Sequence, residues 1–245
     1  MKLDEFTHKT SYTAPKAGRD RHLIRALGPW LDEAIHTALA AAPGSTVLDV
    51  GCGAQPLRPM VERLGGSYVG MDVVQNDAEA VSIIGPIDGD LPEPWPDARV
   101  DYPIVLCTEV LEHVKDWERA FTNLRSLVAP GGRMVVTTPF FFPLHMQPHD
   151  YFRATPFLLE RMADDHGFAV ERLDRLGDPL AVVASTIEDV SIVPVGAGIM
   201  ARAKASVARK VRNFAIKVST SEWWRSGLEV SSNHYLGSAA VLKAA

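Results

Sequence analysis

Hydrophobic residues recur at two different spacings along the chain, and the changes of spacing predict the order of helices and strands. Between Arg19 and Ala42 they follow one another at steps of three and four residues, which predicts one amphipathic helix that ends at Pro43-Gly44. Short β-branched runs and helical stretches then alternate, and this alternation predicts parallel βαβ units. The expected strands cover residues 46–50, 67–71, 81–84, 102–107, 133–138, 169–176 and 236–242, the expected helices residues 57–64, 117–128 and 156–166, and a turn residues 130–132.

An insertion of about sixty residues separates the last two expected strands, at about 177–235. Part of it has apolar residues at helical spacing, namely Met200, Ala203, Val207, Val211, Phe214 and Val218. The same part carries six positive charges and no acid, and Trp223 and Trp224 follow it; the charges are Arg202, Lys204, Arg209, Lys210, Arg212 and Lys217. Such a helix, at 199–218, could lie on an anionic membrane surface or receive an anionic substrate. The alternative is a lid helix with a solvated basic face, and in either case we expect a mobile cover over the acceptor side.

Composition and charge narrow the class of protein. Of 245 residues, 47% are hydrophobic and 22% are charged, which is typical of one globular domain with a full core. A net charge of −5 argues against a protein that coats nucleic acid, so we expect no nucleic-acid partner. The N-terminus lacks the apolar core of a signal peptide and no apolar run is long enough to span a membrane, so we expect a cytoplasmic protein. Cys52 and Cys107 fit neither a disulfide framework nor a zinc site.

A glycine turn after the first buried strand is the most informative segment. Val47 to Gly53 reads VLDVGCG, in which a strand enters a turn that lets backbone approach a ligand closely. Nicotinamide dinucleotide sites have the same layout with G-x-G-x-x-G, but the third glycine is missing here. Asp49 would be unfavourable beside a pyrophosphate and favourable beside a cationic amino-acid or sulfonium group. The sign of this charge therefore separates the two types of cofactor.

Acidic groups follow the next strands. Asp72 ends the second strand about twenty residues after the glycine turn, where a carboxylate can hold a ribose diol. The turn-rich loop IDGDLP, residues 87–92, could accept the adenine amino group, or it could be a solvated turn. Cys107 ends a later strand at the edge where α/β sheets bind ligands, and we place it beside the cofactor. The alternative is that Cys107 is a small core residue.

Six segments in order, VLDVGCG, YVGMD, IDGDLP, CTEVLEHV, LVAPGGRMVVTTP and HDYFRAT, resemble a class I S-adenosylmethionine-dependent methyltransferase of the type 11 group. The resemblance covers roughly residues 46–168. It implies a Rossmann-like α/β fold, with a seven-stranded, mostly parallel sheet of order 3-2-1-4-5-7-6 and helices on both faces. The final strand would be antiparallel.

The resemblance also implies S-adenosyl-L-methionine as cofactor and assigns residues to it. The methionine end would lie against Asp49, Gly51, Cys52 and Gly53, the ribose would bind Asp72, and the adenine would meet Asp88 with Gly89. The acidic loop is one residue shorter than the usual pattern, which leaves Asp88 and Asp90 as competing candidates.

The acceptor side is expected on the loop after the fifth strand. His145 and His149 lie there, and a histidine near its ordinary pKa of about 6.5 is a natural base for a hydroxyl acceptor. The alternative is catalysis by positioning alone. Asp150 and Arg153 are expected to pair and fix this loop. No cluster has the sequence spacing of magnesium or zinc ligands, so we expect no metal site.

These observations predict a methyltransferase acting on a small-molecule or glycan acceptor, at oxygen. A nicotinamide-dependent oxidoreductase and a non-catalytic cofactor-binding partner subunit are the alternatives. Residues 1–42 would form an N-terminal arm, with Phe6 and Tyr12, and a lid helix; that helix could instead only pack on the sheet. Residues 43–245 would form the methyltransferase domain, with its helical insertion before the last strand.

Overall fold

The computed structural model describes most of the chain: Tyr12, residues 20–92, Trp95, residues 101–190, Ile192, residues 198–221, Trp223, Ser226 and residues 233–245. Phe6 and Trp224, which the sequence analysis singled out, lie outside the described residues.

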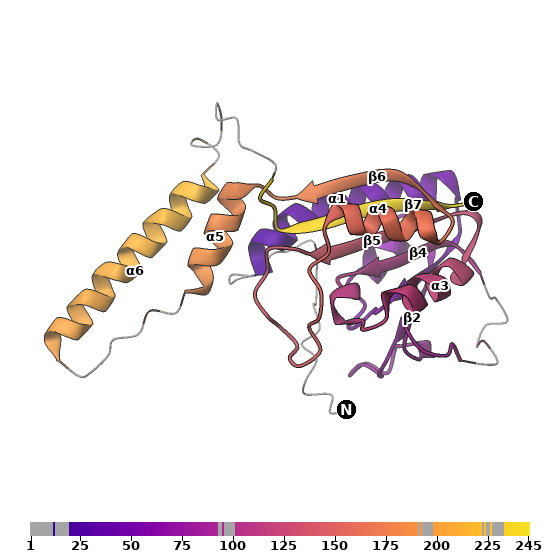
Figure 1. Cartoon of the computed structure of the whole chain (residues 1–245), viewed down its shortest axis with the longest axis horizontal. Coiled ribbons are helices and arrows are strands. Elements are labelled where there is room, and N and C mark those ends of the chain that lie inside the picture. The colour runs from indigo at the N-terminus through magenta and orange to yellow at the C-terminus, as the bar shows by residue number, and fades with distance from the viewer. Residues whose placement is uncertain are drawn as a thin grey trace.

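One seven-stranded sheet runs through the molecule in the order β3-β2-β1-β4-β5-β7-β6 (Figure 1). Strands β1 to β5 pair in parallel, whereas β7 is antiparallel to both β5 and β6. The expected strand order is therefore confirmed. The strands are β1 (Thr46–Val50), β2 (Ser67–Asp72), β3 (Ile83–Ile84), β4 (Tyr102–Thr108), β5 (Val128–Pro139), β6 (Phe168–Leu176) and β7 (Gly237–Ala244).

Helices cover both faces of the sheet, and each face has its own apolar core. On one face α1 and α2 pack against β1, β4 and β5, and on the other α3 and α4 pack against the same strands. The helices are α1 (Asp20–Ala41), α2 (Arg58–Arg63), α3 (Trp117–Leu127), α4 (Pro156–Asp165), α5 (Pro179–Asp189) and α6 (Ile199–Thr220), with a 3-10 turn η2 (Leu111–His113). The fold is Rossmann-like, as expected.

Helix α1 is a core element and not a lid. Its apolar stripe is buried against the sheet, with Leu27, Leu31 and Ile35 fully inaccessible. Tyr12 lies on the helix at Gly28, where a Cβ atom would come within 2.1 Å of the Tyr12 carbonyl oxygen. The lid expectation for this helix is thus corrected, because the stripe that predicted the helix is used for packing on the sheet.

Two details of the sheet differ from expectation. The third strand covers only Ile83–Ile84, because it pairs with β2 at two positions. Residues 130–132, expected as a turn, lie inside β5 as an irregularity in its pairing with β4. A Cβ atom at Gly132 would lie within 3 Å of two backbone carbonyls, so the close approach there requires glycine.

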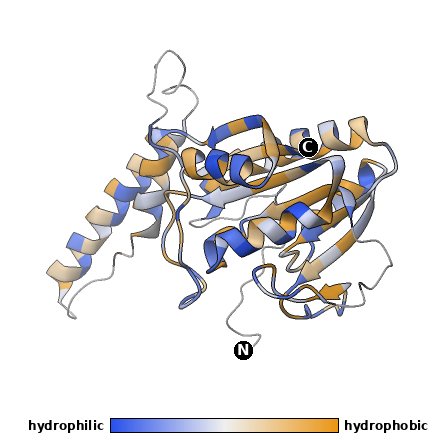
Figure 2. Cartoon of the chain, turned by 45° about the vertical axis from the view of Figure 1, so that its right-hand side comes forward, coloured by the Kyte–Doolittle hydropathy of each residue, from blue (hydrophilic) through white to orange (hydrophobic). Residues whose placement is uncertain are grey.

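The insertion lies outside the sheet, as expected, and its described residues form two helices, of which the sequence analysis predicted α6 but not α5. Helix α5 is tied to α1, because His22 Nε2 lies 2.6 Å from the carboxylate of Glu188. Helix α6 packs along α5 and projects away from the sheet (Figure 1), with polar and apolar residues alternating along it (Figure 2). Among the described residues, no helix is both long and apolar enough to cross a membrane.

Candidate functional site

The glycine turn after β1 has the backbone geometry that sequence reasoning requires. Gly51 and Gly53 both have positive φ, at 73° and 50°. A Cβ atom at Gly51 would lie 2.2 Å from Val110 Cγ2, so a side chain there would clash. The amides of Gly51 and Cys52 donate to the Met71 carbonyl, which fixes the turn against the end of β2. The turn thus leaves its outer surface as bare backbone.

Asp49 is buried directly before this turn. Its carboxylate is 2% exposed and accepts a hydrogen bond from the Tyr68 hydroxyl at 2.5 Å. Burial raises the pKa of Asp49 to about 7; the Tyr68 hydrogen bond opposes this rise and the nearby Asp72 charge adds to it. A cationic ligand next to Asp49 would therefore lower the free energy needed to ionise this carboxyl group.

Asp72 ties the end of β2 to the glycine turn. One carboxylate oxygen accepts from the Gly53 amide at 2.8 Å, and the other accepts from the Val73 amide at 2.7 Å. Each carboxylate oxygen has a second lone pair, so Asp72 keeps the capacity to accept from a ribose hydroxyl.

Asn76 and Gln55 support the turn, and sequence reasoning missed both. The Asn76 side chain donates to the Gly53 carbonyl at 2.8 Å, and its oxygen accepts from the amides of Ala78 and Ala80. Gln55, in the left-handed region with φ of 58°, donates to the Ala80 carbonyl. The only sequence signal was their polar character, since the carbonyls to which Asn76 and Gln55 donate lie 23 and 25 residues away in the chain.

The structure separates the two acids of the loop after β3. Asp90 is exposed and pairs with Arg119, whereas Asp88 is half-buried and accepts from the Lys115 amide at 3.3 Å. Asn123 donates to the carbonyls of Ile87 and Gly89, which holds this loop against α3. Asp88 is therefore the better placed of the two candidates.

Both cysteines are buried. Cys52 Sγ packs against Gly70, where a Cβ atom would come within 2.8 Å of the sulfur. Cys107 is fully inaccessible in the main core. Burial raises the pKa of both thiols, so neither is a nucleophile in this state. The Cys107 side chain is thus a small core residue, as in the alternative interpretation.

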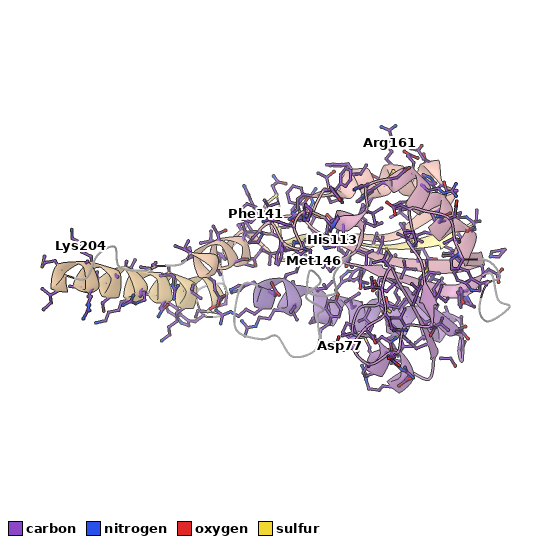
Figure 3. All side chains as sticks on the ribbon, turned by 90° about the horizontal axis from the view of Figure 1, so that it is seen from below. Asp77, His113, Phe141, Met146, Arg161 and Lys204 are labelled. Carbon is purple, nitrogen blue, oxygen red and sulfur yellow. The ribbon has the colours of Figure 1, made fainter. Side chains whose placement is uncertain are left out.

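On the acceptor side, a cluster of ligand-type groups forms between η2 and the loop after β5. Glu112, His113 and His145 each place one ligand atom within 4.8 Å of the others. Glu112 is 1% exposed, and neither of its carboxylate oxygens has a hydrogen-bond partner among the described residues. Figure 3 shows His113 at the centre of the molecule, between the sheet and the projecting helices.

Both imidazoles in this cluster direct Nε2 toward the same carboxylate. His113 Nδ1 lies 2.6 Å from the His149 carbonyl, which can only accept, so Nδ1 carries the proton and a neutral ring has its lone pair on Nε2. Nε2 lies 3.6 Å from Glu112 Oε1 in His113 and 3.7 Å in His145. These separations are too long for hydrogen bonds. They are close to the roughly 3.3–3.6 Å between two atoms that bind one metal ion at about 2.1 Å.

The three groups could therefore hold a divalent cation, or they could share protons. The expectation of no metal site was based on spacing within single segments, and this cluster combines two segments that are distant in the chain. Glu112 lies in the CTEVLEHV segment, but its burial without a partner depends on the loop that folds over it.

Asp150 and Arg153 form the expected pair. Arg153 binds Asp150 through two nitrogens, at 2.5 and 2.7 Å, and the His145 amide donates to the same carboxylate. Burial opposes ionisation of Asp150, but these hydrogen bonds outweigh it together, so the pKa of Asp150 lies below its ordinary value. The pair thus positions His145. His149 is partly exposed, and its Nδ1 lies 3.0 Å from the Tyr151 hydroxyl.

A cavity of about 480 Å³ is lined by residues that precede and follow His145 in the loop, and the His145 ring contacts one of them, Phe142. Its lining is mainly apolar and includes three consecutive phenylalanines, Phe140 to Phe142, together with Phe152. Ser185 and Thr186 of α5 close it on the side of the insertion. The part of the insertion that borders the acceptor side is therefore α5, whereas the expectation of a cover also included the basic helix.

Comparisons with known proteins agree with this geometry. A family model described as a methyltransferase domain matches residues 19–173. The ubiquinone biosynthesis O-methyltransferase of Rhizobium rhizogenes is 37% identical over 102 residues, which cover 39% of this chain and 41% of that protein. The protein of the same name from Chromobacterium violaceum is 29% identical over 182 residues, 62% of this chain and 77% of that protein. The chain thus matches less than half the length of the first relative.

Two solved structures share the fold. The cyclopropane synthase MmaA2 from Mycobacterium tuberculosis superposes with a TM-score of 0.54 at 13% identity, covering 98% of this chain and 90% of that chain. An S-adenosylmethionine-dependent methyltransferase from Mesorhizobium loti gives a TM-score of 0.50 at 12% identity, covering 94% and 100%. At such identities the two structures establish the arrangement of the elements alone.

Proposed function

We propose, on the premise that the chain belongs to the methyltransferase domain family and is an S-adenosylmethionine-dependent enzyme, that it methylates a hydroxyl oxygen of a small aromatic molecule. The observation that carries this proposal is a cavity lined by phenylalanines, one of which, Phe142, contacts the ring of His145, whose amide is held by Asp150. The names of the relatives, ubiquinone biosynthesis O-methyltransferases, support oxygen as the methylated atom.

Cofactor contacts are proposed at the carboxyl ends of β1, β2 and β4 and in the loop after β3. The methionine end would lie on the Gly51-Cys52-Gly53 turn with Asp49 beneath it, the ribose at Asp72, and the adenine at Asp88 and Gly89. Since the Cys107 thiol is buried in the core, only its backbone could contribute. An ionised Asp49 would favour a cationic sulfonium or ammonium group over a pyrophosphate.

The cavity favours an aromatic acceptor over a glycan. Phenylalanine rings offer apolar surface and edge-to-face contacts for another ring. The many hydroxyls of a sugar would lose their hydrogen bonds to water in such a lining, which costs free energy for each unpaired group.

Methyl transfer is an in-line displacement: the acceptor oxygen bonds to the methyl carbon, the carbon–sulfur bond breaks, and the hydroxyl proton must leave. We propose that His145 accepts this proton, because Asp150 holds its backbone amide and its ring contacts Phe142, which lines the cavity. A divalent cation at Glu112, His113 and His145, when bound, would supply a Lewis acid for an acceptor oxygen. In that case His145 would bind the cation and His145→Ala would remove a ligand.

The test measures transfer of a labelled methyl group to a panel of phenols, catechols and matched anilines, followed by variants with the best acceptor. We expect methyl ethers as products, with turnover reduced about a hundredfold or more in His145→Ala and less than tenfold in His149→Ala. Cofactor affinity is measured in both variants, to show that only the acceptor side changed.

The same assay, repeated after removal of divalent cations by a chelator and with Glu112→Gln, shows whether His145 acts as a general base or as a ligand of a divalent cation. Loss of turnover on chelation that a divalent cation restores would assign His145 to the cation. If both histidine variants keep more than about a tenth of wild-type turnover, positioning alone accounts for catalysis. Methylation of anilines only would overturn the proposed oxygen acceptor.

A further inference from the structure

Helix α6 has two separate faces, and only one of them is packed. Helix α6 packs along α5, and the buried residues among its 22 are Ala205 and Ser219. With 100° of rotation per residue, these two lie on one side of the helix, and the apolar stripe lies on a different side. The stripe therefore does not take part in the contact with α5.

The apolar stripe remains exposed along the projecting helix. Met200, Val207, Val211 and Phe214 keep between 61% and 68% of their surface accessible, although they follow one another at helical spacing. Trp223, just beyond the helix, is 74% exposed. A continuous apolar stripe of this kind on a protein surface marks an interaction site more often than scattered single residues do.

Three lysines border this stripe. At 100° per residue, Lys204 lies along one border, and Lys210 and Lys217 lie along the other. All three are exposed, and no aspartate or glutamate occurs in α6. Lysine can keep its alkyl stem on apolar surface while its ammonium group reaches polar groups beside it. The face as a whole is thus apolar in the middle and positive at both borders.

Two arginines of α6 have another role. Arg212 donates to the Val190 carbonyl at 3.0 Å and Arg209 to the Ile192 carbonyl at 3.4 Å, in the segment that joins α5 to α6. These contacts hold Val190 and Ile192 against α6. Arg202 is exposed but, at 100° per residue, lies away from the apolar stripe. The cations that border the stripe are therefore the three lysines, whereas the sequence alone gave all six cations equal weight.

We propose that the face formed by Met200, Val207, Val211 and Phe214 with Lys204, Lys210 and Lys217 docks on an anionic membrane surface. An amphipathic helix with a basic polar face can lie in the plane of the bilayer interface. Its apolar side is then among the acyl chains and its lysines are at the anionic headgroups. The face matches both layers of such a surface. An acidic protein or a second copy of this chain would instead have to offer apolar side chains to the stripe and acidic side chains to the lysines at both of its borders.

The experiment is flotation of the full chain with vesicles of neutral phosphatidylcholine, with and without anionic phosphatidylglycerol. We expect binding to the anionic vesicles only, weakened by added salt. Lys204→Gln, Lys210→Gln and Lys217→Gln together should lower partitioning roughly a hundredfold, at roughly fivefold for each lysine. A control with the same change of net charge replaces Arg58, Arg63 and Arg161 by glutamine, and it should float like the wild type.

The apolar part is tested with Phe214→Ser against Phe157→Ser, which removes an equally exposed phenylalanine from α4. Only Phe214→Ser should weaken flotation, and both variants should fold because both side chains lie on the surface. Absence of flotation, or equal flotation of the α6 variants and their controls, would overturn the proposal. So would sedimentation that shows a dimer dependent on Phe214, because the face would then bind a second copy.

Discussion

Single residues in this protein derive their roles from partners that are distant in the chain. Asp49 was expected from its place before the glycine turn, but its hydrogen bond from Tyr68 and its raised pKa follow from the pairing of β1 with β2. Glu112 was quoted within a motif without a role, because nothing local shows that its carboxylate is buried without a partner. Sequence thus indicates which residue types matter, and burial determines what they do.

The raised pKa of Asp49 predicts a pH dependence of stability. Its pKa is about 7 in the folded chain and about 3.9 when unfolded, so the unfolded state loses its proton first. The stabilisation is complete below about pH 4 and is lost as the pH rises through 7. Between pH 5 and pH 8 the ligand-free wild type should therefore lose roughly 2 kcal/mol relative to Asp49→Asn, which stays neutral.

Denaturant unfolding of both proteins across this range measures the difference. Binding of the demethylated cofactor should show the opposite trend, because its ammonium group favours ionised Asp49: affinity should rise with pH in the wild type more than in Asp49→Asn. Parallel pH profiles of the two proteins would contradict the assignment of a raised pKa to Asp49.

At the scale of elements, the loop between β5 and α4 depends on one ion pair. Arg153→Met would remove the guanidinium that pairs with the carboxylate of Asp150, whose side chain is 2% exposed, and we expect a loss of about 2–3 kcal/mol near pH 7. Because the pKa of Asp150 is lowered by folding, the contribution is present above about pH 4 and is lost as the pH falls through the folded value.

The matched control is Arg161→Met, which removes an exposed pair with Asp165 on α4 and should cost less than about 0.5 kcal/mol. Unfolding curves at pH 7 and pH 3.5 test both variants. Equal losses in the two variants, or a loss in Arg153→Met that persists at low pH, would contradict a structural role for the Asp150–Arg153 pair.

Most elements were predictable because their periodicity is local, and the strand order followed from the family resemblance. The expectations that differed depend on packing. Helix α1 packs on the sheet although its amphipathic pattern also suits a lid, because one stripe serves either purpose. The stripe of α6 has the same pattern but stays exposed, since α5 contacts the other side of that helix. Pattern alone does not show which of two helices is covered.

At the scale of the whole molecule, the loop after β5 and the projecting helices α5 and α6 lie at the same end of the sheet (Figure 1), and residues of that loop and of α5 line the aromatic cavity. Helix α5 links the cavity to α6, because it lines the cavity and also carries α6. If both proposals hold, docking of α6 would place the cavity beside a membrane, from which an apolar acceptor could enter. That consequence depends on the proposed acceptor, whereas vesicle binding by α6 does not.

The central claim is that one cofactor, S-adenosylmethionine, binds where β1 and β2 end. Calorimetry with the wild type and Asp72→Ala tests it most directly. We predict that the wild type binds S-adenosylmethionine and its demethylated product but not NADH, and that Asp72→Ala weakens cofactor binding by about 1.5–3 kcal/mol. Asp72→Asn serves as a variant of the same shape, and folding of each protein is checked by thermal unfolding. Preferential binding of NADH, or unchanged affinity in a folded Asp72→Ala protein, would contradict the account.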